Sequence, residues 1–267
     1  MTDAPNHLFR YFRYDSVDKA HIERLLFQDE IYLGPASEFG DPFDSLARPM
    51  IDPTEDGLRK IARDAVARDT PDLDPARKAM EVSKWMKMGY QANSTLIKEV
   101  EARLLKEARS ATGVYCMSTV CDDPQMWRHY AAGQTGFCLI FQRDEVFNEA
   151  RPVTYSDTRP RIECTGAFGG EEIVESLLTK SLVWQHENEW RILQLPRQGG
   201  IGYRSFTPTI LEGVIIGDMM PVATRKEFLA LIAKRPYPVK VYRVVPVEGS
   251  YTLEVVDIEQ SEMAYRP

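Results

Sequence analysis

The chain has 267 residues, of which 43% are hydrophobic and 27% are charged, a composition ordinary for one globular core with room for an insertion. Its formal net charge of −7 argues against a broad basic surface that grips nucleic acid through phosphates. The sequence shows neither a signal peptide nor an apolar stretch long enough to span a membrane, so we expect a cytoplasmic protein. Four cysteines without a CxxC pair favour buried free thiols over a metal site.

The N-terminal part predicts two strands around one helix. Residues 8–14 are short, aromatic and strand-like, and residues 20–26 keep helical spacing of apolar side chains. Residues 30–34 predict the second strand. A turn-forming Gly-Asp-Pro loop follows, which we expect Phe39 and Phe43 to anchor.

Residues 53–111 differ from their surroundings. Charge rises, β-branched residues become scarce and a 3.6-residue periodicity appears twice. We predict a helical insertion within a single domain of residues 1–267. A solvated helical cap is the simpler interpretation, and a lid over a site is the alternative.

The second half predicts many short strands and few helices. One short helix has Asp123 as its N-cap and Pro124 at its first position. Residues 171–182 and 221–234 predict two more helices, and the chain closes with two strands that suit a hairpin. Because strands and helices do not alternate strictly, we expect an α+β fold rather than a doubly wound sheet.

Residues 187–195, with the sequence ENEWRILQL, contain the most informative pattern. In a strand, Glu187, Glu189 and Arg191 point to one face, while Ile192 on the other face packs on the core. A solvated edge, with Arg191 pairing to Glu189, is the simplest interpretation of such a face.

Three features of the neighbourhood favour a functional site instead. Trp184 precedes the carboxylates, the strand lies in the β-rich half of the chain, and Lys180 with Ser181 ends the preceding helix. We therefore treat the two glutamates as candidate catalytic residues.

Two aromatic motifs supply further candidates. Arg13 shares a face of the first strand with Tyr11, and an arginine among aromatic rings can hold a phosphate or ribose. Trp127 and Tyr130 lie three apart on one side of a helix, where they either pack in the core or form a stacking platform. For each motif alone, a structural role is the simpler interpretation.

Several sequence segments resemble, in the same order along the chain, those of a bacterial protein family, domain-of-unknown-function family 2971. The segments extend from about residue 8 to residue 217 and read FRYFRYDS, IYLGPASEFGDPFD, YCMSTVCDDPQMWRHYAAGQTGFCLIF, LTKSLVWQHENEWRIL and GVIIG. Gly40 stands where that family usually has Asn, and residues 53–111 lie outside the segments. The family name carries no function.

The order of parts also resembles the ADP-ribosyltransferase superfamily. Those enzymes carry an Arg or His on the first core strand, a Ser-Thr or Tyr element in the middle and a late Glu, often as Glu-x-Glu. The corresponding residues here are Arg13, then Ser118 with Thr119 or Tyr130, then Glu187, Asn188 and Glu189. The resemblance implies split, mixed and antiparallel sheets of short strands.

It also implies a reaction, the transfer of ADP-ribose from NAD to a protein or nucleic-acid acceptor by a toxin or phage-defence enzyme. Glu189 would face the positive charge that develops on the ribose, and Glu187 would orient or deprotonate the acceptor. Residues expected to bind NAD are Arg13, Tyr11, Ser118, Trp127, Tyr130, Lys180 and Arg191. No GxGxxG motif is present, so a Rossmann-type NAD site is not predicted.

Two other functions remain open at this point. A metal-dependent nuclease could use Asp41, Asp44, Glu187 and Glu189 with Lys180, although Arg191 stands where the usual acidic-x-Lys pattern has lysine. The other is a non-enzymatic interaction or sensor module of a defence or stress system.

Overall fold

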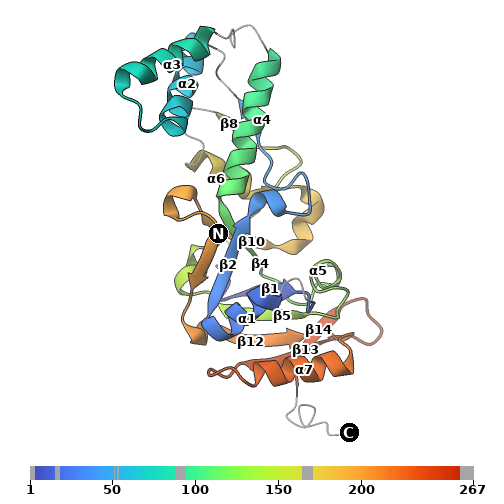
Figure 1. Ribbon diagram of the computed structural model, residues 1–267. Coiled ribbons are helices and arrows are strands. Elements are labelled where there is room, and N and C mark those ends of the chain that lie inside the picture. Colours follow the sequence, from blue (N-terminus) through green and yellow to red (C-terminus); the bar gives the residue numbers. More distant parts are fainter. Residues whose placement is uncertain are drawn as a thin grey trace.

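The computed structural model describes residues 4–15, 19–50, 52, 54–87, 94–163 and 171–258. The predicted α+β class is confirmed, because helices surround a mixed, mostly antiparallel ten-stranded sheet (Figure 1). Cys164 and the two ends of the chain lie outside the described residues.

The N-terminal part forms the predicted strand, helix and strand. These are β1 (His7–Phe12), α1 (Lys19–Gln28) and β2 (Glu30–Pro35), followed by the short 3-10 helix η1 (Ala36–Glu38) and by β3 (Arg48–Met50). The alternating burial of β2 fits a strand with one face on the core.

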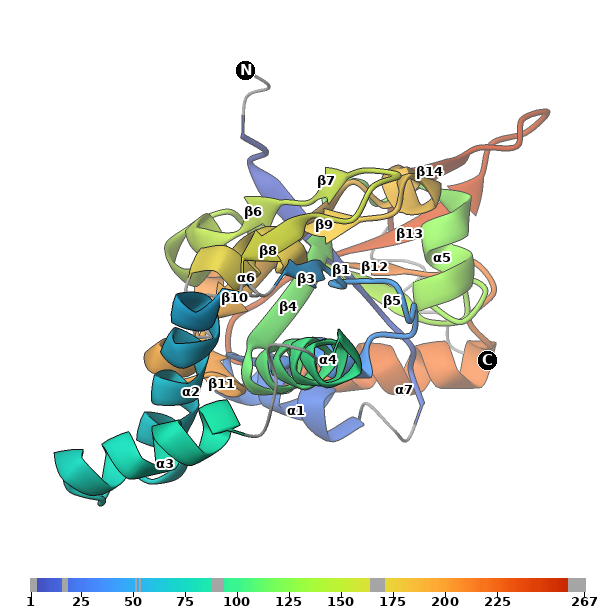
Figure 2. The same cartoon turned by 90° about the horizontal axis from the view of Figure 1, so that it is seen from above.

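The predicted insertion is helical. It consists of α2 (Glu55–Asp69), α3 (Pro75–Lys87) and α4 (Ser94–Ala111). In Figures 1 and 2, α2 and α3 project away from the sheet, and they share a small core that contains Ala62 and Val82. α4 contacts β2, β3 and η1, so it packs the insertion against the body.

The second half contains short strands and short helices. In chain order they are β4 (Gly113–Ser118), α5 (Pro124–Tyr130), β5 (Phe137–Gln142), η3 (Glu145–Glu149), β6 (Arg151–Pro152), β7 (Thr154–Tyr155), β8 (Arg161–Glu163), α6 (Glu171–Leu177), β9 (Thr179–Lys180), η4 (Leu182–Glu187), β10 (Glu189–Gln194), η5 (Pro196–Gln198), β11 (Gly202–Ser205), η6 (Pro208–Ile210), β12 (Leu211–Ile216), α7 (Val222–Ile232), β13 (Lys240–Pro246) and β14 (Leu253–Asp257). The Asp123 cap of α5 and the β13–β14 hairpin are as predicted.

The sheet divides at β4. One edge of β4 pairs with β10 along its whole length. The other edge pairs with β2 only at Gly113 and Val114, and with β1 only where Phe9 faces Ser118. The β4 residues between these two pairings therefore have no strand partner on this edge, and β1 and β2 diverge there.

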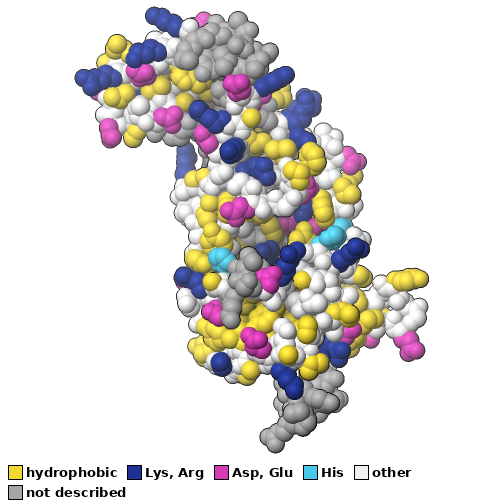
Figure 3. Space-filling model, turned by 45° about the vertical axis from the view of Figure 1, so that its right-hand side comes forward, with side chains coloured by type: hydrophobic (Ala, Val, Ile, Leu, Met, Phe, Trp, Pro, Cys, Tyr) yellow, Lys and Arg dark blue, Asp and Glu magenta, His cyan; other side chains and the backbone are white. Residues whose placement is uncertain are grey.

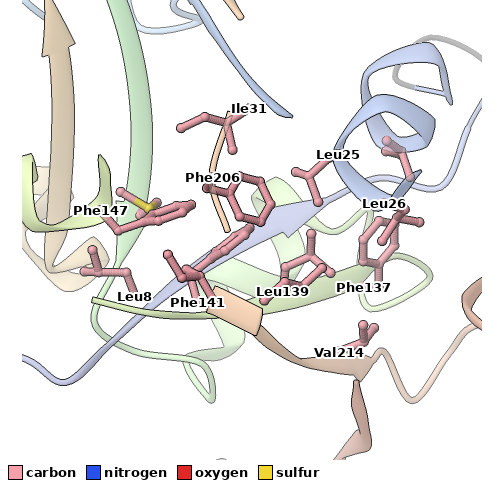
Figure 4. Close-up of a cluster of buried hydrophobic side chains, with 14 of the residues drawn as sticks. Leu8, Leu25, Leu26, Ile31, Phe137, Leu139, Phe141, Phe147, Phe206 and Val214 are labelled. Atoms are coloured by element: carbon pink, nitrogen blue, oxygen red, sulfur yellow. The ribbon is translucent and has the colours of Figure 1, made fainter. Parts of the chain in front are cut away.

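The main core includes buried side chains of α1 and α7 and of the sheet, and Figure 4 shows part of this cluster. Its centre is aromatic, with Phe141 stacked on Phe147 at 4.5 Å and edge-on to Phe206 at 5.8 Å. Aromatic pairs at such spacings stabilise a core beyond the area that they bury. A second core lies under α5, where fully buried Trp127 meets Tyr11 edge-on at 5.3 Å.

Four strands were not predicted, namely β3, β8, β9 and β11. β3 pairs in parallel with β8, β9 pairs in parallel with β7, and β11 adds to the edge of β2. These strands have two to four residues, too few to show a clear period of two. No helix in the described ranges is long and apolar enough to cross a membrane.

Candidate functional site

A cavity of about 780 Å³ opens where β1 and β2 leave the edge of β4. Its volume lies in the range of small-molecule and cofactor sites. The residues that line it come from both halves of the divided sheet and from α1, α5 and η4. The sheet division thus creates an opening in which side chains of β1 and β4 can reach one ligand.

Lys180 is the centre of a buried charged cluster on the cavity wall. Its ammonium group donates to Glu187 Oε2 and, at 3.0 Å, to Glu189 Oε2, and it lies 3.4 Å from Asp44 Oδ2. The side chain is only 5% exposed and passes the ring of Trp184 at 5.3 Å. Three carboxylates therefore share one lysine.

Arg191 binds Glu189 and Asp44 of the cluster from the side away from the cavity. Its Nε and Nη2 donate to the two oxygens of Glu189 at 2.7 and 2.9 Å, and Nη2 also donates to Asp44 at 2.8 Å. Nη1 donates to Ser45 Oγ and to the carbonyl of Leu177. This guanidinium is fully buried and does not line the cavity, so it fixes Glu189 and takes no direct part in binding.

The chain segment that carries the glutamates is not a continuous strand, so the predicted shared strand face is wrong. Glu187 ends the 3-10 helix η4, Asn188 is left-handed with φ 43° and ψ 49°, and β10 begins at Glu189. The predicted solvated edge is also wrong, since Glu187 and Glu189 are 2% and 6% exposed. The left-handed turn, and not strand alternation, brings both carboxylates to Lys180.

The loop after η1 supplies the third carboxylate. Asp44 is buried beside Ser45, which has φ 55° and whose carbonyl accepts from Ser176. Arg191 also packs over Phe39 at 5.1 Å, so Phe39 anchors the loop as predicted. Phe43 does not, because 60% of it is exposed.

The two glutamates have pKa values shifted in opposite directions. Burial raises the pKa of Glu189, but Arg191 and Lys180 outweigh it and hold the pKa far below its usual range. Burial is the largest influence on Glu187 as well, and with the nearby Glu189 it outweighs Lys180, so the pKa of Glu187 is raised. A pair of carboxylates shifted apart in this way suits two different roles in acid–base chemistry.

Arg10 is the cavity's basic residue on β1. It donates to the carbonyl of Cys116 at 2.6 Å across the opening and lies over the ring of Tyr115 at 5.0 Å. Its Nε has no hydrogen-bond partner among the described residues. Arg13, the residue predicted to bind NAD, follows the end of β1 and is exposed. It is one of the residues that line the cavity.

Of the other predicted site residues, Tyr11, Ser118 and Tyr130 line the cavity and Trp127 does not. Tyr130 lines the cavity and donates to Glu187 Oε1 at 2.6 Å. Trp127 is fully buried outside the cavity, so the structure gives its ring no face for stacking a ligand. Tyr11 and Ser118 line the cavity, but their hydroxyls donate to the carbonyls of Val120 and Glu187.

The carboxylates do not suit a magnesium ion as arranged. Lys180 lies among Asp44, Glu187 and Glu189, and Asp41 instead accepts from Trp184 Nε1 at 2.7 Å. No group of three His, Cys, Asp or Glu side chains able to hold a metal was found in the part of the chain that the structure describes. The donor set thus favours an organic cation or a proton over a divalent ion.

Three residues of the site were missed by the sequence analysis. Arg10 was passed over for Arg13, although both lie in the same FRYFRY motif. Phe39 was predicted only as a loop anchor. Tyr155, on β7, accepts from the backbone N–H of Glu189 at 2.8 Å, and no local pattern indicated that contact.

Comparisons with known proteins returned nothing: no family model, no curated protein and no solved structure matches this chain. The two family resemblances drawn from the sequence motifs therefore remain predictions.

Proposed function

We propose that this protein is an NAD-dependent ADP-ribosyltransferase that transfers ADP-ribose to a macromolecular acceptor, a protein or a nucleic acid. The observation that carries the proposal is the pair Glu187 and Glu189, buried on one cavity wall with opposite pKa shifts. Arg10 on β1 adds a cation that could bind the pyrophosphate of NAD.

Cleavage of the nicotinamide–ribose bond builds positive charge on the ribose. Glu189 is kept ionised by Arg191 and Lys180, so it is suited to stabilise that charge. With every group ionised, three carboxylates and two cations leave the cluster one negative charge, which favours a cationic transition state.

Glu187 is suited to the second task, accepting a proton from the attacking nucleophile. Its raised pKa makes it a better base than an ordinary carboxylate. Lys180 and Tyr130 each bond one of its oxygens, which fixes its orientation toward the cavity.

Nicotinamide release from NAD tests the proposal, with a cell lysate as the source of acceptors. We expect release by the wild type and a loss of at least about 100-fold in Glu187→Gln and Glu189→Gln. Glu175→Gln is the matched control, since Glu175 is exposed on α6 outside the cavity. Absence of both nicotinamide release and NAD binding in the folded wild type would refute the proposal.

A further inference from the structure

Tyr130 has the contacts of an activated nucleophile. It ends α5, lines the cavity and keeps 39% of its surface exposed. Its hydroxyl donates to Glu187 Oε1 at 2.6 Å, and the other oxygen of Glu187 is held by Lys180. A hydroxyl, a base and a third group that orients the base form the usual arrangement for nucleophilic catalysis.

Three other hydroxyl-bearing side chains that line the cavity, Tyr11, Tyr115 and Ser118, lack this arrangement. Tyr11 and Ser118 donate to backbone carbonyls, at 2.9 and 2.6 Å. Tyr115 has no hydrogen-bond partner for its hydroxyl among the described residues. Of these four side chains, Tyr130 alone is bonded to a carboxylate of the cluster and is also exposed enough to carry an added group.

We propose that Tyr130 is itself an acceptor, so that the protein attaches ADP-ribose to its own Tyr130. This inference rests on the proposed function. A bond forms between Tyr130 Oη and the anomeric ribose carbon, while the bond from that carbon to the nicotinamide nitrogen breaks. The nitrogen keeps the electron pair, the phenolic proton moves to Glu187, and neutral nicotinamide leaves.

The surroundings of Tyr130 make the base necessary. Burial, with Glu187 close by, raises the pKa of Tyr130, so the free phenolate does not form near neutral pH. Proton transfer to Glu187 during the attack removes that obstacle. Because Tyr130 lies on the cavity wall, the attached group would remain in the cavity and limit further turnover.

The test is to incubate the full chain with NAD and no other acceptor, then to measure intact mass and map the modified peptide. We expect a gain of one ADP-ribosyl group on Tyr130, absent in Tyr130→Phe and slowed by about 100-fold or more in Glu187→Gln. Glu175→Gln should be modified like the wild type. Tyr251, which is fully exposed, is the internal control within the same digest.

Three outcomes overturn this inference while leaving the proposed function in place. One is nicotinamide release with no adduct on Tyr130. Another is equal labelling of Tyr251, or labelling of Tyr130 by free ADP-ribose, since either shows non-enzymatic attachment. Absence of release and of an adduct without an added acceptor overturns this inference alone, whereas absence of both NAD binding and nicotinamide release by folded protein even with the lysate acceptors overturns the proposed function as well. The wild-type peptide map decides the question even if a variant does not fold.

Discussion

Glu187 and Glu189 differ in the number of hydrogen bonds that their carboxylates make to buried cations. Glu189 satisfies Arg191 at both oxygens and also contacts Lys180, whereas Glu187 contacts Lys180 and Tyr130. Loss of Glu189 removes the two-oxygen partner of buried Arg191 and leaves it paired with Asp44. Breaking a buried ion pair in this way is strongly destabilising. Glu189→Gln should therefore lower the free energy of unfolding by on the order of 3 kcal/mol.

Urea unfolding at pH 7 measures this loss. Glu187→Gln should cost less free energy of unfolding, because Arg191 then keeps both of its carboxylates, Asp44 and Glu189. Equal losses in the two variants would contradict the asymmetry. Activity is then compared only between variants shown to be folded.

The same contacts predict how stability depends on pH. The pKa of Glu189 is lower when folded than its ordinary value of 4.5, so its ionised form contributes stability above about pH 4.5. That contribution is lost as the pH falls below 4.5 toward the folded value. Glu187 acts in the opposite sense, because its pKa is raised and its ionised form disfavours folding.

Unfolding free energies at pH 7 and pH 3.5 test this dependence. The wild type should lose more stability on acidification than Glu189→Gln, which lacks the titrating group. Parallel losses would show that other carboxylates determine the acid sensitivity.

Arg10 allows a test of binding separate from catalysis. Arg10→Gln removes a charge and a fork of donors from the cavity, and hydrogen bonds to charged groups contribute about 1.5–3 kcal/mol. We expect NAD or ADP-ribose to bind about 10–100-fold more weakly, as measured by calorimetry. Arg197→Gln, an exposed site on η5, is the matched control. Unchanged affinity in Arg10→Gln would remove Arg10 from the ligand site.

At the scale of elements, the junction between η4 and β10 determines the site. Asn188 occupies a left-handed conformation that costs most residues about 1–2 kcal/mol but is readily adopted by Gly and Asn. Asn188→Gly should keep both stability and activity. Asn188→Val should lower the melting temperature and reduce activity, because the turn places Glu187. If the valine variant behaves like the wild type, the turn does not control the site.

This junction also shows what could not be predicted from sequence. A strand was expected through residues 187–195, and β10 confirms that expectation from Glu189 to Gln194. Glu187, at the start of the predicted strand, instead ends the 3-10 helix η4. Trp184 bonds Asp41, 143 residues away, and a contact of that range leaves no local signature.

Other elements could be predicted because their signals are local. The cap of α5 by Asp123 and the helical periodicity of residues 53–111 depend on neighbouring residues only. The burial of Arg191 could not be predicted, because a charged strand residue is normally exposed. Its complete burial depends on hydrogen bonds to Asp44, Ser45 and Leu177, which are distant in the sequence.

At the scale of the whole molecule, the insertion is separate from the cavity. None of the described residues of α2, α3 or α4 lines it, which favours the predicted solvated cap over the alternative of a lid. On the face drawn in Figure 3, basic, acidic and hydrophobic side chains are interspersed, and no broad basic surface is seen there.

Removal of the projecting helices tests their role. Replacing residues 55–87 with a short Gly-Ser linker should leave the Michaelis constant for NAD unchanged within about twofold, because the cavity residues remain. The measurement is nicotinamide release at varied NAD. A large rise in that constant would restore the lid interpretation, whereas a change only with a macromolecular acceptor would assign α2 and α3 to acceptor binding.

The contacts of Arg191 have a consequence for how related sequences would diverge. Arg191 is buried and donates hydrogen bonds to both Asp44 and Glu189. A substitution of any one of the three residues therefore destabilises the fold. We expect related sequences to keep all three residues or to replace them together. Glu187 lies outside this mutual dependence. A related protein that has lost the activity should therefore lack Glu187 but retain Glu189, because Glu189 is needed for stability.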